Sequence, residues 1–476
     1  MKFNFIFPNI YTPISFSPAI QILSAVLKEA GHEVCLTHIH KEKIPDDDGA
    51  IVEDIRENKP DIIGITSTSF EYVRCNEIAG VLKNEFNVPV ILGGIHATIS
   101  PEDFPSSNFD AFVIGESENL IVDIANKKIE PRGILSGGIT KNLDTLPFND
   151  WDIMDSKKII ESKGNWLDIG FSRGCPFNCA FCANNLLRKI KGEPYVRKRN
   201  ISKCIDELNY VLSKFDVKVI NFSDDEFTLN HKWLFQFLDI FKKEFFEKRG
   251  IQFVVESRVD TFTEAIAKKL KESGCREVQF GVESGSDKIL SFLNKGITKE
   301  QIKKAFDTAR KYEMKTYAYM MIGIPTETEK DLQETMEFLS VVKPDLIRPT
   351  FLCPVKGTEV YNYCIKHRLI NKGVTVWNYE SPLKLDTMDE ETLLKYWFLF
   401  PWLINKYMGY PEYQKKIDIY FKKNFNHSQT FETIIDEDKE LSDKMKKKGK
   451  QHYIYKAEKG KGEDRTFRFN RLELIK

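Results

Sequence analysis

Three cysteines lie close together in the middle of the chain, at Cys175, Cys179 and Cys182, within the segment SRGCPFNCAFC. Cysteine thiolates are the usual protein ligands of iron–sulfur clusters. Three ligands serve three irons of a four-iron cluster and leave the fourth iron open to a substrate or cofactor. A structural zinc site needs a fourth ligand, usually from a second CxxC pair, and the sequence contains no such pair. The spacing therefore predicts a four-iron cluster with one reactive iron.

The remaining composition is that of a soluble globular protein. The 476 residues include 70 Lys and Arg and 70 Asp and Glu, so no net charge points to nucleic acid or to an anionic membrane. No apolar run approaches the roughly 20 residues of a spanning helix, and the first ten residues do not resemble a signal peptide. We expect a cytoplasmic protein. The six other cysteines are expected to be small buried hydrophobes rather than disulfide partners.

The first part of the chain alternates strand-like and helix-like segments. The predicted strands are residues 3–7, 34–39, 61–66, 88–92 and 109–114, and the clearest predicted helices are 18–30 and 70–85. Alternating strands and helices indicate βαβ units and a parallel sheet. The sequence therefore predicts a Rossmann-like domain over residues 1–141, whose ligands would bind at the carboxyl ends of the strands.

Residues 142–165 carry acidic and turn-forming side chains without periodicity, and we interpret them as a linker. A second strand–helix series follows over residues 166–365. Its predicted strands are 166–171, 217–222, 252–256, 277–282, 315–322 and 346–351, with helices between them, and we expect a full or partial β/α barrel. Catalytic residues of such barrels stand at the carboxyl ends of the strands.

Residues 366–476 form a mainly helical C-terminal region in this interpretation, as a substrate cover or as packing. The aromatic segment 393–404 is expected to be core, with a membrane contact or an apolar substrate wall as alternatives. The Lys-rich segment 444–461 is expected to be a solvated tail or helix face.

The cysteine segment resembles the CxxxCxxC motif of radical S-adenosylmethionine (SAM) enzymes. The resemblance implies that Cys175, Cys179 and Cys182 bind a [4Fe–4S] cluster whose open iron is chelated by SAM. Reductive cleavage of SAM would then produce a 5′-deoxyadenosyl radical that abstracts hydrogen. In the family an aromatic residue between the last two cysteines lies near the adenine, and here that residue is Phe181.

Later segments of the barrel fit the same resemblance. Arg258 follows the third predicted strand and could pair with the SAM carboxylate. Family members use a segment such as residues 281–285 near the ribose, which makes Glu283 a candidate, and an apolar segment such as 321–325 behind the adenine, which makes Ile324 another. A carboxylate after the second strand can accept hydrogen bonds from the SAM ammonium, and the candidates are Asp224, Asp225 and Glu226.

The N-terminal domain resembles the cobalamin-binding domain that is often fused in front of a radical SAM barrel. Glycines and small hydroxyl residues follow its strands, where they let a large planar ligand approach the backbone. The resemblance spans residues 1 to about 365. The cobalamin-binding candidates are Thr66, Ser67, Gly93, Gly94, His96, Gly115 and Glu116.

One feature of that domain departs from the family pattern. The DxHxxG motif, whose histidine coordinates cobalt, is absent, because His38 and His40 lack the required Asp and Gly. His96 is therefore expected to contact the periphery of the cofactor, or to be a plain loop histidine. A nicotinamide site is disfavoured because no GxGxxG follows the first strand.

These features predict a cobalamin-dependent radical SAM methyltransferase that acts on an unactivated carbon, or another poorly nucleophilic centre, of a small molecule. The aromatic C-terminal segment suggests an apolar substrate. One SAM would supply the methyl group through cobalamin, and a second would supply the radical. The alternatives are a cyclase, rearrangement or carbon–carbon coupling enzyme with the same cofactors, and a non-catalytic iron–sulfur or corrinoid carrier. A flavodoxin or ferredoxin is the expected electron donor.

Overall fold

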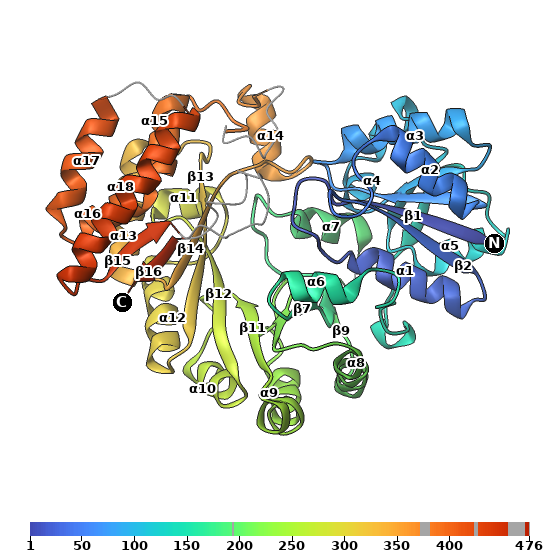
Figure 1. Cartoon of the computed structure of the whole chain (residues 1–476), viewed down its shortest axis with the longest axis horizontal. Coiled ribbons are helices and arrows are strands. Elements are labelled where there is room, and N and C mark those ends of the chain that lie inside the picture. Colours follow the sequence, from blue (N-terminus) through green and yellow to red (C-terminus); the bar gives the residue numbers. More distant parts are fainter. Residues whose placement is uncertain (193–194, 372–380, 423–426, 456–471, 476) are drawn as a thin grey trace. The chain divides into compact units, whose positions relative to one another are not determined.

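The computed structural model describes residues 1–476 except 193–194, 372–380, 423–426, 456–471 and 476 (Figure 1). The chain divides into two compact units. The first comprises residues 1–177, 182–225 and 355–357, and the second comprises 178–181, 226–354 and 358–476. Residues 178–181, which include Cys179, therefore belong to the second unit, whereas Cys175 and Cys182 belong to the first. The domain limits predicted from the sequence stay predictions.

The first unit contains a six-stranded parallel sheet with the order β2-β1-β3-β4-β5-β6. Five of its strands coincide with predicted strands. The sixth, β6, was missed because its sequence, GILSGG, contains three glycines, which weaken a strand signal. The strands are β1 (Lys2–Pro8), β2 (Glu33–Ile39), β3 (Ile62–Thr66), β4 (Val90–Gly93), β5 (Ala111–Gly115) and β6 (Gly133–Gly138).

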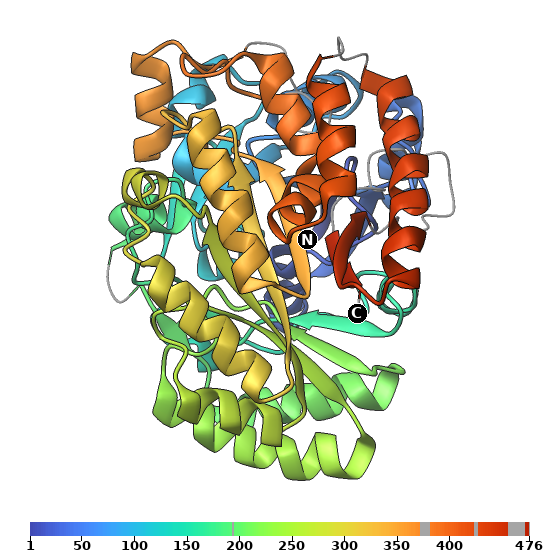
Figure 2. The ribbon, with the colours of Figure 1, turned by 90° about the vertical axis from the view of Figure 1, so that its left-hand side faces the viewer.

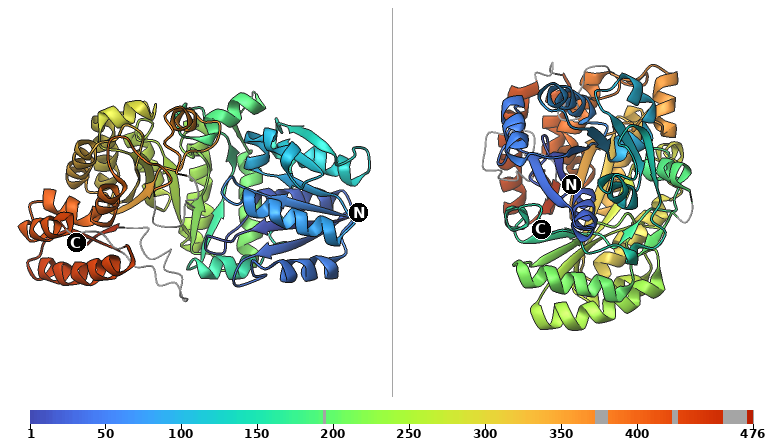
Figure 3. Two further views of the ribbon diagram at one scale, coloured as in Figure 1. Left: turned by 90° about the horizontal axis from the view of Figure 1, so that it is seen from above. Right: turned by 90° about the vertical axis from the view of Figure 1, so that its right-hand side faces the viewer.

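Helices lie on both faces of this sheet (Figure 3). One apolar core joins α1 and α5 to side chains such as Phe3 and Phe5 of β1. A second joins α2 and α3 to the alternate side chains, among them Ile6 and Ile63. This alternation explains why the strands are apolar on both faces. The helices are α1 (Pro18–Glu29), α2 (Asp48–Asn58), α3 (Tyr72–Glu85), α4 (Ile95–Ile99) and α5 (Glu118–Ala125).

The strand order reverses at β1, which lies between β2 and β3. At such a switch point the connections leave β1 and β3 toward opposite faces, and a crevice opens beyond the carboxyl ends of the strands. The Rossmann-like domain predicted from the sequence is thus confirmed, and its topology places the ligand crevice beside the loops that follow β1, β3 and β4.

The first unit continues with the segment that carries two of the three clustered cysteines. Strand β8 precedes α7 in the sequence and β9 follows it, and the two strands form a short antiparallel pair. The longer strands β7 and β10 pair in parallel, with Ile169 opposite Phe222. The elements are α6 (Ser156–Ser162), β7 (Trp166–Ile169), β8 (Ser172–Arg173), α7 (Ala183–Lys191), β9 (Arg197–Lys198), α8 (Ile201–Lys214) and β10 (Val219–Phe222).

The second unit continues the strand–helix repeat, and its strands β11 to β14 pair in parallel, each with the next. The predicted limits of the strands at 315–322 and 346–351 agree with β13 and β14. The strand–helix series that runs along the chain from β7 to β14 is that of the partial β/α barrel expected from the sequence. The elements are α9 (His231–Phe241), β11 (Gln252–Ser257), α10 (Glu264–Glu272), β12 (Cys275–Glu283), α11 (Asp287–Phe292), α12 (Lys299–Lys311), β13 (Lys315–Ile322), α13 (Glu329–Val342) and β14 (Leu346–Phe351).

The C-terminal region is mainly helical, as predicted, and adds two strands that the sequence did not predict. Strand β16 pairs antiparallel with both β14 and β15. His452 and Tyr453 of β15 are fully buried, so this part of the Lys-rich segment is core rather than a solvated tail. The elements are α14 (Glu359–Lys366), α15 (Glu390–Phe398), α16 (Phe400–Tyr407), α17 (Pro411–Lys422), α18 (His427–Lys447), β15 (His452–Tyr455) and β16 (Leu472–Ile475).

The aromatic segment 393–404 forms most of α15 and α16. Leu399, Phe400 and Trp402 are fully buried, and the Trp402 indole donates a hydrogen bond to buried Asp438. The segment is therefore core, as expected. None of the described helices has the length and apolar character needed to cross a bilayer.

Candidate active site

A cavity of about 420 Å³ lies at the carboxyl ends of the strands of the first unit. The ends of β3, β4 and β5 line it, together with the first turns of α1 and residues 168–173. This is the switch-point crevice that the topology predicts. Ser67 and His96 are absent from its lining. The other cobalamin candidates line it, namely Thr66, Gly93, Gly94, Gly115 and Glu116.

Two glycines allow the loops around this cavity to approach each other. Gly94 has a φ of +92°, and a Cβ there would lie 2.8 Å from the carbonyl oxygen of Ser67. Gly115 has a φ of +83°, and a Cβ there would lie 2.7 Å from the carbonyl oxygen of Gly138. L-residues rarely adopt such φ values, and both positions also lack space. The cavity wall therefore requires glycine at both positions.

Gly93 differs, because a Cβ at this position would meet no atom within 4 Å. Its open side faces the cavity that it lines. We expect Gly93→Val to leave the free energy of unfolding within about 0.5 kcal/mol of the wild type, because a Cβ at this position displaces no protein atom and the side chain would extend toward the open cavity. The valine would occupy space that a ligand needs, so the corrinoid bound per chain after anaerobic reconstitution should fall sharply. Full corrinoid binding by this variant would place the ligand elsewhere.

His96 packs against protein side chains rather than lining the cavity. Its ring stacks on Tyr72 with the centroids 3.7 Å apart, and Nδ1 lies 3.1 Å from the Ser69 hydroxyl. Nε2 lies 3.4 Å from a carboxylate oxygen of Asp103. Burial lowers the pKa of His96 to about 4. Among the described residues that line the cavity there is no histidine, cysteine or methionine, so its walls offer no side chain of the usual kind to a cobalt ion.

Glu116 joins this cavity to the cysteine segment through a buried ion-pair network. Its two oxygens accept hydrogen bonds from Arg197 at 2.7 and 2.8 Å, and one of them also accepts from Arg173 at 3.0 Å. Arg173 further pairs with Glu118 at 2.6 Å. Arg173 stands two residues before Cys175. The sequence analysis missed this network, because nothing in the spacing of these residues indicates that they meet.

Two of the three carboxylates after β10 hold the backbone of the cysteine segment. Asp224 accepts from the amide of Phe171 at 3.2 Å and from the Ser172 hydroxyl. Asp225 accepts from the amide of Gly174 at 3.0 Å. These contacts stabilise the entry to the motif. The role predicted for both carboxylates at the SAM ammonium stays a prediction.

Glu226, the third carboxylate, belongs to the second unit. It accepts a hydrogen bond of 2.5 Å from the Thr228 hydroxyl, which lies 2.7 Å from the Ser257 hydroxyl. Burial raises the pKa of Glu226 to about 7. A cation bound beside Glu226 would favour its charged form and lower this pKa.

Two cations of the second unit lie beside Cys179 and Phe181. Arg258 Nη1 lies 3.7 Å from Cys179 Sγ, and the same guanidinium pairs with Asp260. Lys295 Nζ lies 2.8 Å from Glu283 Oε1 and 5.6 Å from the centre of the Phe181 ring. Both cations belong to the surroundings of the cysteine segment within the second unit. The sequence analysis named Arg258 and Glu283 and missed Lys295.

Ile324 lies in a turn whose amides are bound by a buried glutamate. Glu327 Oε2 accepts from the amides of Gly323 at 2.7 Å and Ile324 at 3.2 Å, whereas the buried Oε1 has no hydrogen-bond partner. Burial raises the pKa of Glu327 from 4.5 to about 8. The folded chain thus binds this proton more tightly than the unfolded chain.

The raised pKa of Glu327 predicts a pH dependence of stability. Its contribution is fully present below the unfolded pKa of 4.5 and is lost as the pH rises through about 8. Glutamine keeps the acceptor for the two amides and does not titrate. We therefore expect Glu327→Gln to flatten the fall in unfolding free energy between about pH 5 and pH 9, measured by urea denaturation. Parallel curves for variant and wild type would contradict a protonated Glu327.

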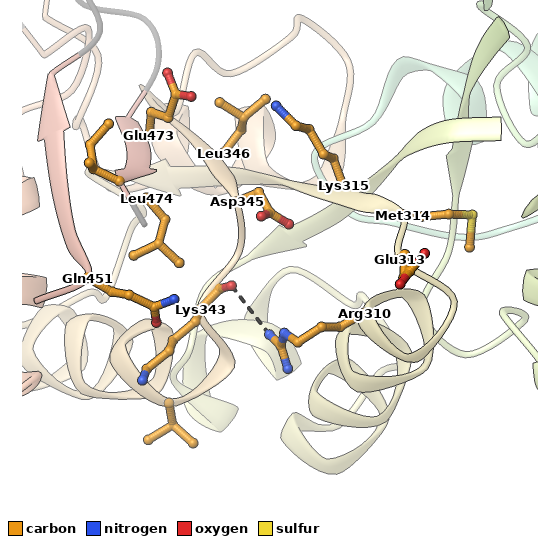
Figure 4. A pocket seen from close by; sticks show the side chains of 12 residues that line it. Arg310, Glu313, Met314, Lys315, Lys343, Asp345, Leu346, Gln451, Glu473 and Leu474 are labelled. Carbon is orange, nitrogen blue, oxygen red and sulfur yellow. Dashed lines mark hydrogen bonds between the residues drawn. The ribbon is translucent and has the colours of Figure 1, made fainter. Parts of the chain in front are cut away.

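A second cavity of about 750 Å³ lies near the amino ends of β13 and β14, beside Lys315 and Leu346 (Figure 4). Charges of both signs surround it, and Arg310 donates hydrogen bonds to the carbonyl oxygens of Val342 and Lys343. Barrel enzymes place their chemistry at the carboxyl ends of the strands. This cavity lies at the other ends, and we assign it no catalytic role.

No group of three His, Cys, Asp or Glu side chains among the described residues is arranged to hold a single metal ion. None of the three clustered cysteines forms a disulfide bond. Ligands of a four-iron cluster bind different irons, so their sulfurs need not converge on one point. The donor set therefore suits a cluster rather than a mononuclear metal.

Comparison with known proteins places this site in a family. Residues 169–339 match the radical SAM superfamily, and residues 13–125 match the B12 binding domain. An uncharacterized methyltransferase of Pyrococcus horikoshii is 34% identical over 342 residues, which cover 67% of this chain and 72% of the relative. This chain belongs to the cobalamin-dependent radical SAM enzymes. It is an enzyme, rather than the carrier that the sequence also allowed.

Further relatives span both outcomes predicted from the sequence. The anaerobic magnesium-protoporphyrin IX monomethyl ester cyclase of Rubrivivax gelatinosus is 24% identical over 431 residues, which cover 83% of this chain and 75% of that protein. The solved radical SAM methyltransferase TsrM of Kitasatospora setae, with cobalamin and a [4Fe–4S] cluster bound, shares the fold with a TM-score of 0.62. It is 16% identical and covers 77% of this chain and 75% of TsrM.

The cofactors typical of this family are a [4Fe–4S] cluster, SAM and cobalamin. The side chains described above fit all three. The cysteines are not joined in disulfides, and Arg258 lies beside Cys179. The switch-point cavity has an open side at Gly93, where a Cβ would meet no atom within 4 Å.

Proposed function

We propose that this cobalamin-dependent radical SAM enzyme transfers a methyl group from SAM to an unactivated carbon, or to another poorly nucleophilic centre, of a small molecule. The relative from Pyrococcus horikoshii carries the name of a methyltransferase, which supports this choice. The cofactors, when bound, supply a methyl donor and a carbon-centred radical. The protein supplies binding, orientation and exclusion of water.

One observation carries the proposal, the shared wall of the switch-point cavity. Ser172 and Arg173, which lead directly into Cys175, line the same cavity as Gly93 and Gly94. A ligand in this cavity therefore lies against the segment that carries the cluster cysteines. Methyl transfer to a substrate radical requires the two cofactors to act on one molecule, and this arrangement supports such proximity.

The residues of the site take the following roles in this proposal. Cys175, Cys179 and Cys182 bind the cluster. Arg258 and the carboxylates after β10 orient the charged groups of SAM, because its ammonium and carboxylate need partners of opposite sign. Phe181 and Ile324 contact its adenine, and Glu283 contacts its ribose. The corrinoid contacts Thr66, Gly93, Gly94, Gly115 and Glu116, whereas Ser67 and His96 support the loops behind them.

A cyclase is the second candidate, because the cyclase of Rubrivivax gelatinosus aligns over 83% of this chain. Such an enzyme would use the same cofactors and would not consume the methyl group of SAM. A flavodoxin or ferredoxin remains the electron donor in both cases.

The two candidates differ in the small molecules that they release. We would incubate the anaerobic holoenzyme with methyl-deuterated SAM, a strong chemical reductant and an extract of small molecules from the source cells. Methyl transfer predicts 5′-deoxyadenosine, S-adenosylhomocysteine and a product that carries the deuterated methyl group, all detected by mass spectrometry. 5′-Deoxyadenosine without S-adenosylhomocysteine would favour the cyclase. The absence of both 5′-deoxyadenosine and S-adenosylhomocysteine would contradict both candidates.

A further inference from the structure

The strands β12, β13 and β14 of the second unit lie side by side and present two distinct faces (Figure 2). One face is apolar and helix-covered. Phe280 of β12 contacts Phe306 of α12 with the ring centres 5.0 Å apart. Ala318 and Ile347, which continue this row on the neighbouring strands, are fully buried. Successive side chains point to opposite faces, so the residues that follow each of these three project from the other face.

The other face carries polar side chains in a row. Gly281 of β12 is the register partner of Tyr319 of β13, which is in turn the partner of Arg348 of β14. Neighbouring strands are about 4.8 Å apart, so the Arg348 Cα lies roughly 10 Å from that of Gly281. An arginine side chain can span most of that distance.

The same face also carries part of the cysteine segment. A Cβ on Gly281 would lie 2.6 Å from Glu283 Oε1 and 2.8 Å from Lys295 Nζ, so this ion pair covers Gly281. Lys295 in turn lies over the ring of Phe181. The row of Gly281, Tyr319 and Arg348 therefore starts beneath the Lys295 side chain, which lies over Phe181, and it ends at Arg348.

Arg348 differs from its polar neighbours because it has no partner. Tyr319 donates a 2.5 Å hydrogen bond to Gln279, and Gln279 donates one of 2.8 Å to Glu277. Glu283 forms an ion pair with Lys295. Among the described residues, none forms a hydrogen bond or ion pair with Arg348, although its Nε is buried.

The buried Nε of Arg348 lacks a hydrogen-bond acceptor among the described residues, and an acceptor on a ligand would satisfy it. Arginine stays protonated in proteins, and a buried donor without an acceptor is unfavourable. Its planar fork binds oxyanions through two parallel hydrogen bonds. We propose that Arg348 binds an oxyanion, a carboxylate or a phosphate, of the substrate and thereby orients the substrate toward the radical. This inference rests on the proposed function, and it replaces the apolar substrate suggested by the aromatic segment, whose side chains are buried in the core.

Labelling with phenylglyoxal, which modifies accessible guanidinium groups, tests the binding step without knowledge of the substrate. We expect Arg348 to be labelled in the anaerobic holoenzyme, as shown by peptide mass spectrometry. Succinate should protect it if the natural ligand is a carboxylate, and pyrophosphate if it is a phosphate. Arg132, whose side chain is 82% exposed, is the internal control and should be labelled equally under all conditions. No labelling, or protection by neither anion, would overturn the proposal. Protection by SAM alone would assign Arg348 to the SAM carboxylate and would equally overturn it.

The substrate itself is tested with Arg348→Gln, Arg348→Lys and the control Arg132→Gln. The small-molecule extract is first separated on an anion exchanger, and each fraction is incubated with methyl-deuterated SAM. We expect a labelled product from the retained fraction, and a roughly 100-fold lower ratio of product to 5′-deoxyadenosine for Arg348→Gln, because one partner of a partly buried charged pair is lost. Lysine should restore part of that ratio, and Arg132→Gln should keep it.

A labelled product from the unretained fraction alone, or an unchanged ratio for Arg348→Gln, would refute anion recognition. A labelled product from no fraction would count against methyl transfer. The phenylglyoxal experiment would then still decide whether Arg348 binds an oxyanion, so the two proposals fail separately.

Discussion

Alanine in place of Cys175, Cys179 or Cys182 is expected to reduce iron content and 5′-deoxyadenosine formation to the level of the unreconstituted protein. In the proposed site each thiolate binds a different iron of the cluster, and the loss of one ligand would leave a site that cannot retain a four-iron cluster. The effect on SAM cleavage is indirect, because an absent cluster supplies neither the open iron nor the electron. Iron analysis, the visible absorbance of the cluster and chromatography of the SAM products measure the three consequences.

Cys204 provides the matched control for these variants. Its side chain is fully buried in α8, and its sulfur lies 3.9 Å from the carbonyl oxygen of Arg199. Burial raises the pKa of this thiol, so it is a poor metal ligand. Cys204→Ala should lose some stability through the small space it leaves and should retain iron and SAM cleavage. Retention of a full cluster by Cys179→Ala would refute the ligand assignment.

Glu116→Ala is expected to lower the free energy of unfolding by about 3–5 kcal/mol. The side chains of Glu116 and Arg197 are only 6% and 5% exposed. Removal of the carboxylate would leave the Arg197 guanidinium buried without its partner, which is the costly state of such a pair. Denaturation of the protein without cofactors measures this effect, so that a loss of corrinoid binding does not contribute to it.

Two further variants separate the buried pair from a general effect of charge. Glu130→Ala removes a carboxylate that is 77% exposed and 3.8 Å from Arg132, and it should change stability by less than about 1 kcal/mol. The double variant Glu116→Leu with Arg197→Leu replaces both charges by apolar groups and should recover most of the loss. A loss below about 1 kcal/mol for Glu116→Ala would mean that the pair is not buried in solution.

The ion pairs of Glu116 also connect the switch-point cavity with the segment of the three clustered cysteines. Glu116 lines the cavity, and Arg173 leads into Cys175. A variant that breaks this contact should therefore weaken both cofactor sites, whereas Gly93→Val should affect only the cavity. Comparing iron and corrinoid content in the two variants distinguishes a shared support from two independent sites.

The sequence by itself determined the fold class and the chemistry of the cluster. Alternating apolar strands and helices predicted the Rossmann-like domain and the partial barrel, because parallel strands buried on both faces are continuous apolar runs. The strands at 315–322 and 346–351 agreed with the structure residue for residue. The cysteine spacing predicted the cluster because all three ligands lie on one short segment. Local patterns of this kind are visible without knowledge of tertiary contacts.

Only the tertiary structure decided which side chains meet across long separations. His96 was a cobalamin candidate by its position after a strand, and its ring is held against Tyr72 away from the cavity lining. The Glu116 network joins residues 81 positions apart, and Lys295 reaches Glu283 and Phe181 from a separate turn. The strand register was needed to show that Arg348 lies on the same face as Gly281 and Tyr319. The hydrogen bonds of the structure then showed that the polar neighbours of Arg348 bind one another. Side-chain direction and ion pairing depend on packing between distant segments, which sequence spacing does not encode.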